Sequence, residues 1–144
     1  MTVVYHGHRD HSEGKTIVLR IDSATGPEPL DWSLDVRNHS PTGLEWGYGG
    51  SGPAQLALAL CCDVLQYDDY AQHVYHHFKW KVIAGLDRED WTLTEEEIRA
   101  TIETIEREIG PFVPSVSCPI HGVSYSIDDL CPICIGEEQE PHDE

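Results

Sequence analysis

Four residues near the C-terminal end have the types and the spacing of metal ligands. Two residues separate Cys118 from His121, two separate Cys131 from Cys134, and nine lie between the two pairs. Each pair belongs to a repeated Cys-Pro-Ile segment, which is typical of a tight turn that directs two side chains at one ion. Three thiolates and one imidazole complete the tetrahedral set that zinc prefers, and they leave no coordination position open. The spacing therefore predicts a structural zinc site in a zinc-knuckle-like unit over 118–136.

The alternative interpretation of these cysteines is reduced thiols or disulfide bonds. Disulfides are rare in the cytosol, and the first residues show neither the basic start nor the apolar middle of a secretory signal, so we expect a cytoplasmic protein. A unit of about 20 residues is too short to bury a core of its own, so the metal would hold it together. Cys61 and Cys62 lie apart from the pattern on an apolar stretch, and we interpret them as core residues.

A glycine-rich segment from Trp46 to Gln55 has the composition of an anion-binding loop. Its glycines allow the backbone to approach a ligand, and it precedes an apolar helix whose first N–H groups attract phosphate or carboxylate. Trp46 and Tyr48 are suited to stacking on a flat ligand, and Arg9 is suited to neutralising its charge. The candidate binding residues are Arg9, Trp46, Gly47, Tyr48, Gly49, Gly50, Ser51, Gly52 and Gln55. The alternative interpretation is a structural crossing in which glycines permit close packing.

No set of residues identifies a reaction. The glycine-rich segment lacks the Gly-Lys-Ser/Thr ending of a Walker loop and the spacing of a dinucleotide fingerprint. His73 and His77 are four residues apart and could share a metal, but the arrangement of metalloproteases is missing, so surface histidines are the favoured interpretation. The sequence contains no Gly-x-Ser-x-Gly segment and no nucleophile with an evident base. We therefore assign no catalytic residue, and we favour a non-catalytic role.

The charge of the chain sets limits on its partners. Its 144 residues include 9 Lys and Arg against 26 Asp and Glu, a formal charge of −17. Direct nucleic-acid binding is not expected, because phosphate contacts need clustered Lys and Arg. Two explanations of the acidity stay open: a solvated surface suited to a salt-rich cytoplasm, or a mimic of nucleic acid that occupies a basic protein. No apolar run approaches the ~20 residues of a membrane span, so no membrane contact is expected.

The apolar periodicity predicts the elements that position these groups. Alternating apolar residues indicate strands over 2–6, 15–22 and 30–36. Helices are expected over 53–65, 68–86 and 94–109; the first is apolar almost all round, and the last begins with a capping box. Strands followed by helices indicate an α+β fold with a small antiparallel sheet.

These elements also predict how the chain is divided. The strands and helices form one α+β domain, which ends at the Gly110-Pro111 pair. The predicted parts are an α+β domain over 1–110, a linker over 111–117, the zinc unit over 118–136 and a disordered acidic tail over 137–144.

The segment from Trp46 to Leu60, Trp-Gly-Tyr-Gly-Gly-Ser-Gly-Pro-Ala-Gln-Leu-Ala-Leu-Ala-Leu, resembles the hallmark of a family of short proteins of unknown function from phages, bacteria and archaea. The likeness covers residues 3 to 98 and includes Tyr5-x-Gly7-x-Arg9, Phe78-Lys79 and Trp91-x-Leu93. Such families often lack the cysteine segment, which marks the zinc unit as an addition, and Cys61-Cys62 stands where leucines are expected. The resemblance implies a shared compact domain and loop, without an established activity. The phage link implies a role against host defence, in the host cytoplasm.

Three functions follow as hypotheses. The favoured one is a non-catalytic protein that binds or sequesters a small anionic, nucleotide-like ligand through the Trp46–Gln55 loop. The second is an acidic protein-interaction module, stabilised by the zinc, that docks on a basic host protein. The third is a nucleotide-processing enzyme whose groups come from distant His and Asp residues. A homo-oligomer is compatible with a small sheet that has open edges.

Overall fold

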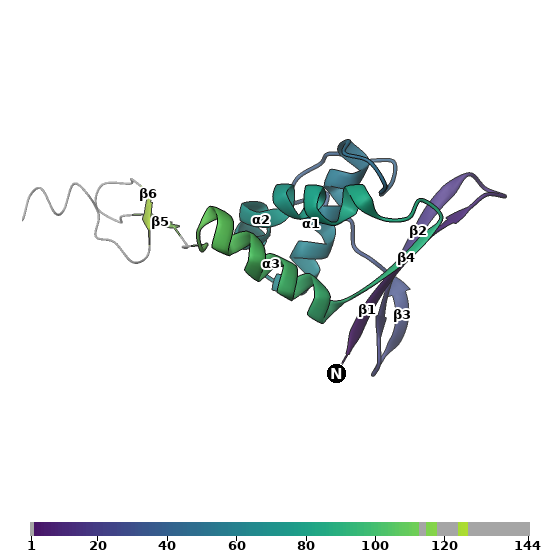
Figure 1. Ribbon diagram of the computed structural model, residues 1–144, viewed down its shortest axis with the longest axis horizontal. Helices are drawn as coiled ribbons and strands as arrows, with labels where there is room; N and C mark the ends of the chain where they lie inside the picture. The colour runs from purple at the N-terminus through teal and green to yellow at the C-terminus, as the bar shows by residue number, and fades with distance from the viewer. Residues whose placement is uncertain (1, 113–114, 118–123, 127–144) are drawn as a thin grey trace, which may run out of the picture. The chain divides into compact units, whose positions relative to one another are not determined.

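The computed structural model describes residues 2–112, 115–117 and 124–126. The chain divides into two units, Met1–Gly110 and Pro111–Glu144, and each is described by itself. The first unit contains a four-stranded antiparallel sheet and three α-helices, which confirms the α+β class (Figure 1). In the second unit, β5 (Ser115–Ser117) pairs with β6 (Ser124–Ser126) in an antiparallel ribbon. The predicted zinc ligands Cys118, His121, Cys131 and Cys134, and the predicted tail over 137–144, lie outside the described residues.

The sheet of the first unit combines an N-terminal meander with one later strand. Its strands are β1 (Val3–Asp10), β2 (Lys15–Asp22), β3 (Gly26–Pro29) and β4 (Asp90–Thr94), in the spatial order β3-β2-β1-β4. Tyr5 of β1 lies opposite Arg20 of β2 and Leu93 of β4. Because side chains alternate along a strand, Val3, Tyr5 and Gly7 face the core, where all three are buried.

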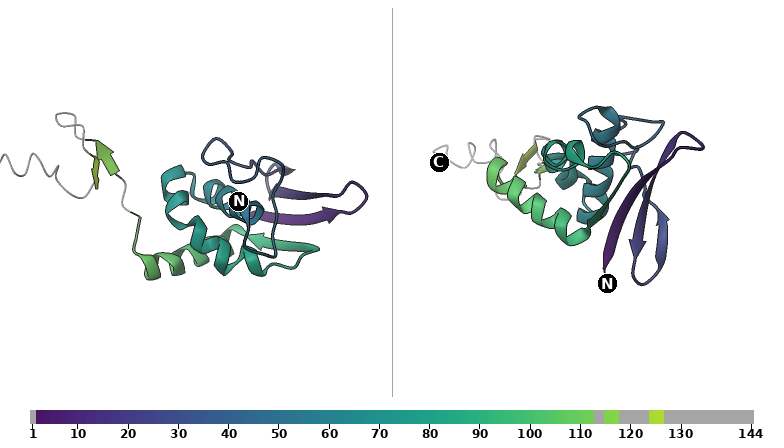
Figure 2. Two further views of the ribbon diagram at one scale, coloured as in Figure 1. Left: turned by 90° about the horizontal axis from the view of Figure 1, so that it is seen from above. Right: turned by 45° about the vertical axis from the view of Figure 1, so that its right-hand side comes forward.

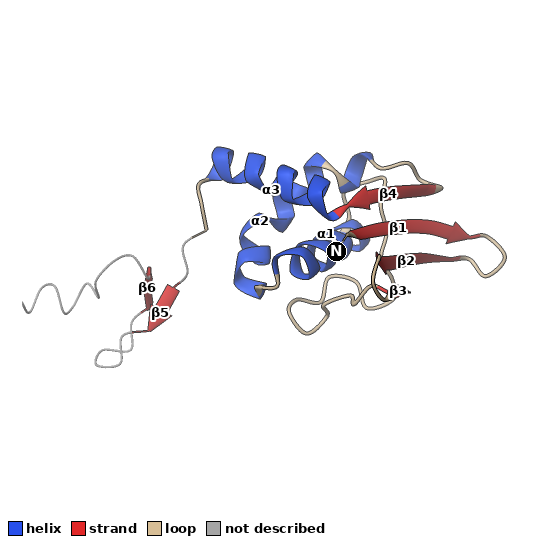
Figure 3. Cartoon of the chain, turned by 90° about the horizontal axis from the view of Figure 1, so that it is seen from below, coloured by secondary structure: helices blue, strands red, loops and turns tan. Residues whose placement is uncertain are grey.

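The helices gather on one side of the sheet (Figures 2 and 3). They are α1 (Ser51–Leu65), α2 (Asp68–Lys81) and α3 (Glu95–Ile109), and a short 3-10 helix, η1 (Ile83–Gly85), follows α2. Every residue of α1 from Gly52 to Cys62 is buried, so the helix is central, as its composition predicts. In the described part of the chain, no helix is both long enough and apolar enough to cross a membrane.

One predicted strand is wrong, and the sequence analysis did not predict β3 or β4. The stretch 30–36 is not a strand: Ser33 has a left-handed backbone with φ of 58°, and its N–H donates to the Asp31 carboxylate at 2.9 Å. Leu30 is buried, and its N–H still donates to the Val18 carbonyl of β2 at 3.1 Å, but the left-handed Ser33 prevents extended pairing from continuing beyond it. The sheet instead contains β4, which the sequence prediction missed because its five residues carry three polar side chains.

Candidate functional site

The glycine-rich loop leads into α1 and leaves the start of this helix uncapped. Gly50 is the N-cap residue and supplies no side-chain cap, and its carbonyl accepts the Ala54 N–H at 3.0 Å. Within the described residues, the N–H groups of Ser51 and Gly52 donate no hydrogen bond. These two donors, together with the positive end of the helix dipole, are the groups that bind oxyanions at helix starts.

A pocket of about 420 Å³, here named the α1 pocket, opens at this helix start. Lys15 comes from β2 and Tyr48 and Ser51 from the loop, so the pocket joins segments that lie far apart in the sequence. Its lining residues are Gly14, Lys15, Thr16, Trp32, Ser40, Thr42, Gly43, Leu44, Glu45, Tyr48, Ser51 and Gly52. The Tyr48 ring is 43% exposed, and Lys15 is exposed and pairs with Glu13 at 2.8 Å. The lining therefore combines several hydroxyl groups, the rings of Trp32 and Tyr48, the cation of Lys15 and the two residues of the open helix start, Ser51 and Gly52.

Trp46 does not reach this pocket, which corrects its predicted role in stacking. Its side chain is 0% exposed, and its indole N–H donates to the Arg88 carbonyl at 3.1 Å. Its ring lies edge to face with Trp91, with centroids 5.6 Å apart. A ring that is covered on all sides has no face for a ligand, so Tyr48 is the ring that the loop exposes.

Arg9 is also occupied, which corrects its predicted role as a counter-charge. Its guanidinium donates to both carboxylate oxygens of Glu45, at 3.0 and 2.7 Å, and lies 4.9 Å from the centre of the Trp46 ring. The hydrogen bonds to Glu45 raise the pKa of Arg9. A bidentate pair of this kind neutralises the cation, so Arg9 is not available as a counter-charge for a ligand.

Gln55 is a structural residue in this fold and not a ligand contact. It is 0% exposed, and its Oε1 accepts the N–H groups of His39 at 2.7 Å and Ser40 at 3.2 Å. Its Nε2 donates to the Trp32 carbonyl at 2.6 Å. Three bonds to one segment mean that Gln55 fixes the irregular stretch 30–40 against α1, in place of the strand pairing that this stretch lacks.

Several loop glycines are required by packing. A Cβ atom at Gly49 would lie 2.2 Å from the Trp80 indole, and one at Gly52 would lie 2.6 Å from the Glu45 Cβ. Gly47 has φ of 86°, a conformation that favours glycine, and its N–H donates to the Ile83 carbonyl at 2.9 Å. The alternative interpretation of the loop as a close structural crossing therefore holds at these positions, beside the open helix start.

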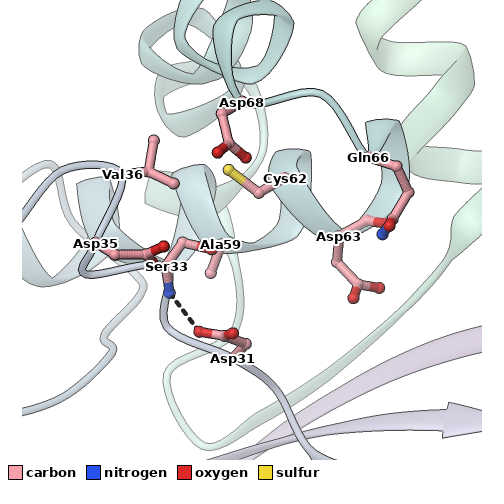
Figure 4. Close-up of a pocket in the computed structure, with 9 residues that line it drawn as sticks. All are labelled: Asp31, Ser33, Asp35, Val36, Ala59, Cys62, Asp63, Gln66 and Asp68. Carbon is pink, nitrogen blue, oxygen red and sulfur yellow. Dashed lines mark hydrogen bonds between the residues drawn. The ribbon is translucent and has the colours of Figure 1, made fainter.

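A second pocket, of about 190 Å³, surrounds Cys62 and is here named the acidic pocket (Figure 4). Its lining residues are Asp31, Ser33, Asp35, Val36, Ala59, Cys62, Asp63, Gln66 and Asp68. Burial, followed by the charges of Asp68, Asp35 and Asp31, raises the pKa of Cys62 to about 11. The thiol therefore stays protonated at neutral pH, so it is a poor nucleophile. Cys61 and Cys62 are both buried, as the sequence predicts.

Metal ligands do not gather elsewhere in the described part of the chain. No group of three or more His, Cys, Asp or Glu residues there could hold an ion. His73, one of the two histidines four residues apart on α2, has a ring nitrogen 3.0 Å from the Gly110 carbonyl.

The chain matches a family of unknown function, DUF6166, over residues 5–104. It belongs to that family. No curated protein matches the chain, and no solved structure does. The range that DUF6166 covers contains every candidate residue of the loop, Arg9 included, and ends before Cys118.

The sequence analysis missed two groups that the structure brings to the loop. Lys15 reaches the α1 pocket from the sheet, and Trp80 of α2 lies against Gly49 with 63% of its side chain exposed. A signal for Trp80 was present in the sequence, since this large apolar residue falls outside the buried stripe of Ala71, Val74 and Phe78. No local signal pointed to Lys15, because its place depends on how the sheet meets the loop.

Proposed function

We propose that this member of DUF6166 is a non-catalytic binding protein that takes a small anionic ligand in the α1 pocket. The observation that carries the proposal is the open helix start: Ser51 and Gly52, whose N–H groups lack hydrogen-bond partners within the described residues, line a pocket of about 420 Å³. A phosphate or carboxylate placed there accepts both N–H bonds and lies at the positive end of α1.

The remaining groups of the pocket fit a ligand that also has a flat part. The Tyr48 ring is available for stacking, the Ser51 hydroxyl for hydrogen bonding and the Lys15 ammonium for an ion pair. Glu45 also lines the pocket and already binds Arg9, so a highly charged anion is disfavoured. The chain charge of −17 repels anions at long range, but screening over a Debye length of about 8 Å leaves the local N–H groups to dominate.

A nucleotide-like signal is one ligand with this chemistry. The sequence resembles a family with members in phages, and this resemblance is the reason to propose that sequestering such a signal counters host defence. This role requires a cytoplasmic location and no turnover. It is consistent with a site that offers N–H donors and one ring but no activated nucleophile among the residues described here.

Two substitutions at one position test the backbone donor. Ser51→Pro removes the amide N–H but suits the first position of a helix, and Gly50 before it already has the extended backbone that proline requires. Ser51→Ala keeps the N–H and removes only the hydroxyl. Isothermal titration with inorganic phosphate and with nucleoside monophosphates is expected to show about tenfold weaker binding for Ser51→Pro than for Ser51→Ala. Equal affinities in two folded variants would contradict the proposal.

We also propose that Cys118, His121, Cys131 and Cys134 hold a structural zinc ion. The support for this proposal is the donor set and its spacing, which match closed tetrahedral sites.

A second candidate function is docking of a basic partner on the acidic pocket. Asp31, Asp35 and Asp68 line this pocket, and none of them forms an ion pair within the described residues. Asp63 differs, because it binds Arg20 at 2.8 Å and accepts the Tyr5 hydroxyl. A lysine or arginine of a partner is a suitable occupant, and its capture would weaken steeply as salt is added.

A further inference from the structure

The few cations of this acidic chain are mostly neutralised by carboxylates. Six of the nine Lys and Arg residues form ion pairs with Asp or Glu: Arg9, Lys15, Arg20, Lys81, Arg99 and Arg107. Arg37, Lys79 and Arg88 form none within the part of the chain that the structure describes. Because the chain has 26 carboxylates, an unpaired cation is uncommon, and the residues around it are candidates for a binding site.

Two of these cations, Arg37 and Lys79, lie beside each other at α2. Arg37 belongs to the irregular stretch before α1, and its guanidinium donates to the Gln72 side chain of α2 at 3.1 and 3.2 Å. Lys79 is itself in α2, is 8% exposed, and has its ammonium 4.5 Å from the centre of the Trp80 ring. Together with two neighbouring histidines they define what we name the Trp80 surface, made up of Arg37, His76, His77, Lys79 and Trp80.

The Trp80 surface also exposes an unusual amount of aromatic ring. Trp80 is 63% exposed, and the far edge of its indole is held against Gly49 of the loop. His76 and His77 stand four and three residues before it, on the same side of the helix, and the three rings line a hollow of about 340 Å³. Three rings that line one hollow offer flat surface on which a ligand ring can stack.

The charged groups with the largest effects on His76 and His39 are cations. Burial, followed by the charges of Lys79, His39, His77 and Arg37, lowers the pKa of His76. Burial, Arg37 and Lys79 lower the pKa of His39, whose ring nitrogen lies 2.8 Å from the Tyr75 hydroxyl. At neutral pH these imidazoles are therefore uncharged, and the fixed positive charges are those of Lys79 and Arg37. Such a pair balances a single phosphate group but not a long polyanion.

We propose that the Trp80 surface binds a nucleoside phosphate. The base stacks on the exposed indole of Trp80, Lys79 forms an ion pair with the phosphate, and His76 supplies a hydrogen bond beside it. Arg37 adds positive potential from the irregular stretch that lies against Gln72 of α2. A free nucleotide and the end of a single strand present this same base-and-phosphate chemistry. The lining residues of the hollow are absent from the α1 pocket, so this inference stands apart from the proposed function.

The test is titration of the full chain with adenosine monophosphate. Adenosine and inorganic phosphate serve as half-ligands, and a short oligothymidylate separates a strand from a free nucleotide. Trp80 is far more exposed than the buried Trp46 and Trp91, so binding is expected to quench its fluorescence. Calorimetry gives the affinity of the variants that lack Trp80. We expect Trp80→Ala and Lys79→Met to weaken binding about tenfold each, and Met keeps the volume of the buried stem.

A matched control decides whether the site lies on this surface. Lys81→Met removes a cation next to Trp80 that is paired with Glu108 at 3.0 Å, and it is expected to keep the wild-type affinity. Equal binding by Trp80→Ala, or no quenching of the Trp80 fluorescence by nucleotide or strand at millimolar concentration, would each overturn the proposal. So would binding of a polyglutamate peptide, through Trp80, in place of the nucleotide.

Discussion

The indole of Trp91 on β4 covers Gly7 on the neighbouring strand β1. The two residues lie opposite each other in the sheet, and a Cβ atom at position 7 would be 2.4 Å from the ring. Trp91 is 6% exposed and also meets Trp46 edge to face, so the ring has little freedom to move. The short segments Tyr5-x-Gly7 and Trp91-x-Leu93, which are distant in the sequence, are therefore two halves of one packing contact.

Gly7→Ala is expected to destabilise the domain by about 1–3 kcal/mol, because the added methyl group must displace a buried indole. Urea unfolding followed by tryptophan fluorescence measures the change. Gly85→Ala is the matched control, since a Cβ atom there would meet nothing within 4 Å. Equal stability of the two variants would show that Trp91 does not cover Gly7.

Replacing Gln55 is expected to loosen the segment that packs against α1. Gln55→Leu keeps the size of the side chain but leaves the His39 N–H, the Ser40 N–H and the Trp32 carbonyl without their partner. Each buried polar group left unpaired costs about 1–3 kcal/mol, so a loss of several kcal/mol is expected. The comparison is Gln72→Leu, which removes only the bonds from the exposed Arg37 and is expected to cost less than about 0.5 kcal/mol. Thermal unfolding in parallel ranks the two variants.

Much of the fold could be predicted because local signals and packing agree. The capping box at the start of α3 forms as its spacing indicates: Thr94 accepts the Glu97 N–H at 3.0 Å, and Glu97 accepts the Thr94 N–H at 2.9 Å. The predicted strand over 30–36 is wrong because alternating apolar residues indicate only that a segment is partly buried. This segment is held against α1 by Gln55, whose Nε2 donates to the Trp32 carbonyl, and it does not form a strand.

The candidate site was harder to predict, because contacts between residues far apart in the sequence decide which side chains are free to bind a ligand. Composition made Arg9 and Trp46 attractive as ligand residues, but Glu45 binds the first and Trp91 packs on the second. Glu45 is distant from Arg9 in the sequence, and Trp91 is distant from Trp46, so no local pattern reveals that both side chains already have partners. The uncapped helix start was predictable, since it depends only on the glycines before α1 and their lack of capping side chains.

Metal analysis tests the predicted zinc unit. One zinc ion per chain is expected in protein purified without chelator, and Cys131→Ser is expected to lose it because one of four ligands is missing. Cys61→Ser is the matched control: this thiol is fully buried in α1 and is expected to leave the zinc content unchanged. Native mass spectrometry reads out the metal directly. Absence of zinc from the wild-type chain would contradict the assignment of Cys118, His121, Cys131 and Cys134.

The raised pKa of Cys62 predicts slow alkylation and a specific pH dependence of stability. Burial favours the neutral thiol in the folded chain, where its pKa is about 11, against about 9 for an ordinary thiol. In the unfolded chain the thiol loses its proton first, so this residue lowers stability as pH rises from about 9 to about 11 and has no effect below that range.

Iodoacetamide labelling at pH 8, read at the Cys62 peptide by mass spectrometry, is expected to be slow. Asp68→Asn removes the largest charge effect on Cys62, so it is expected to lower the pKa of this thiol and speed its labelling. Asp87→Asn, at a carboxylate outside the acidic pocket, is expected to leave the rate unchanged. Equal rates in all three chains would show that the carboxylates do not act on the thiol.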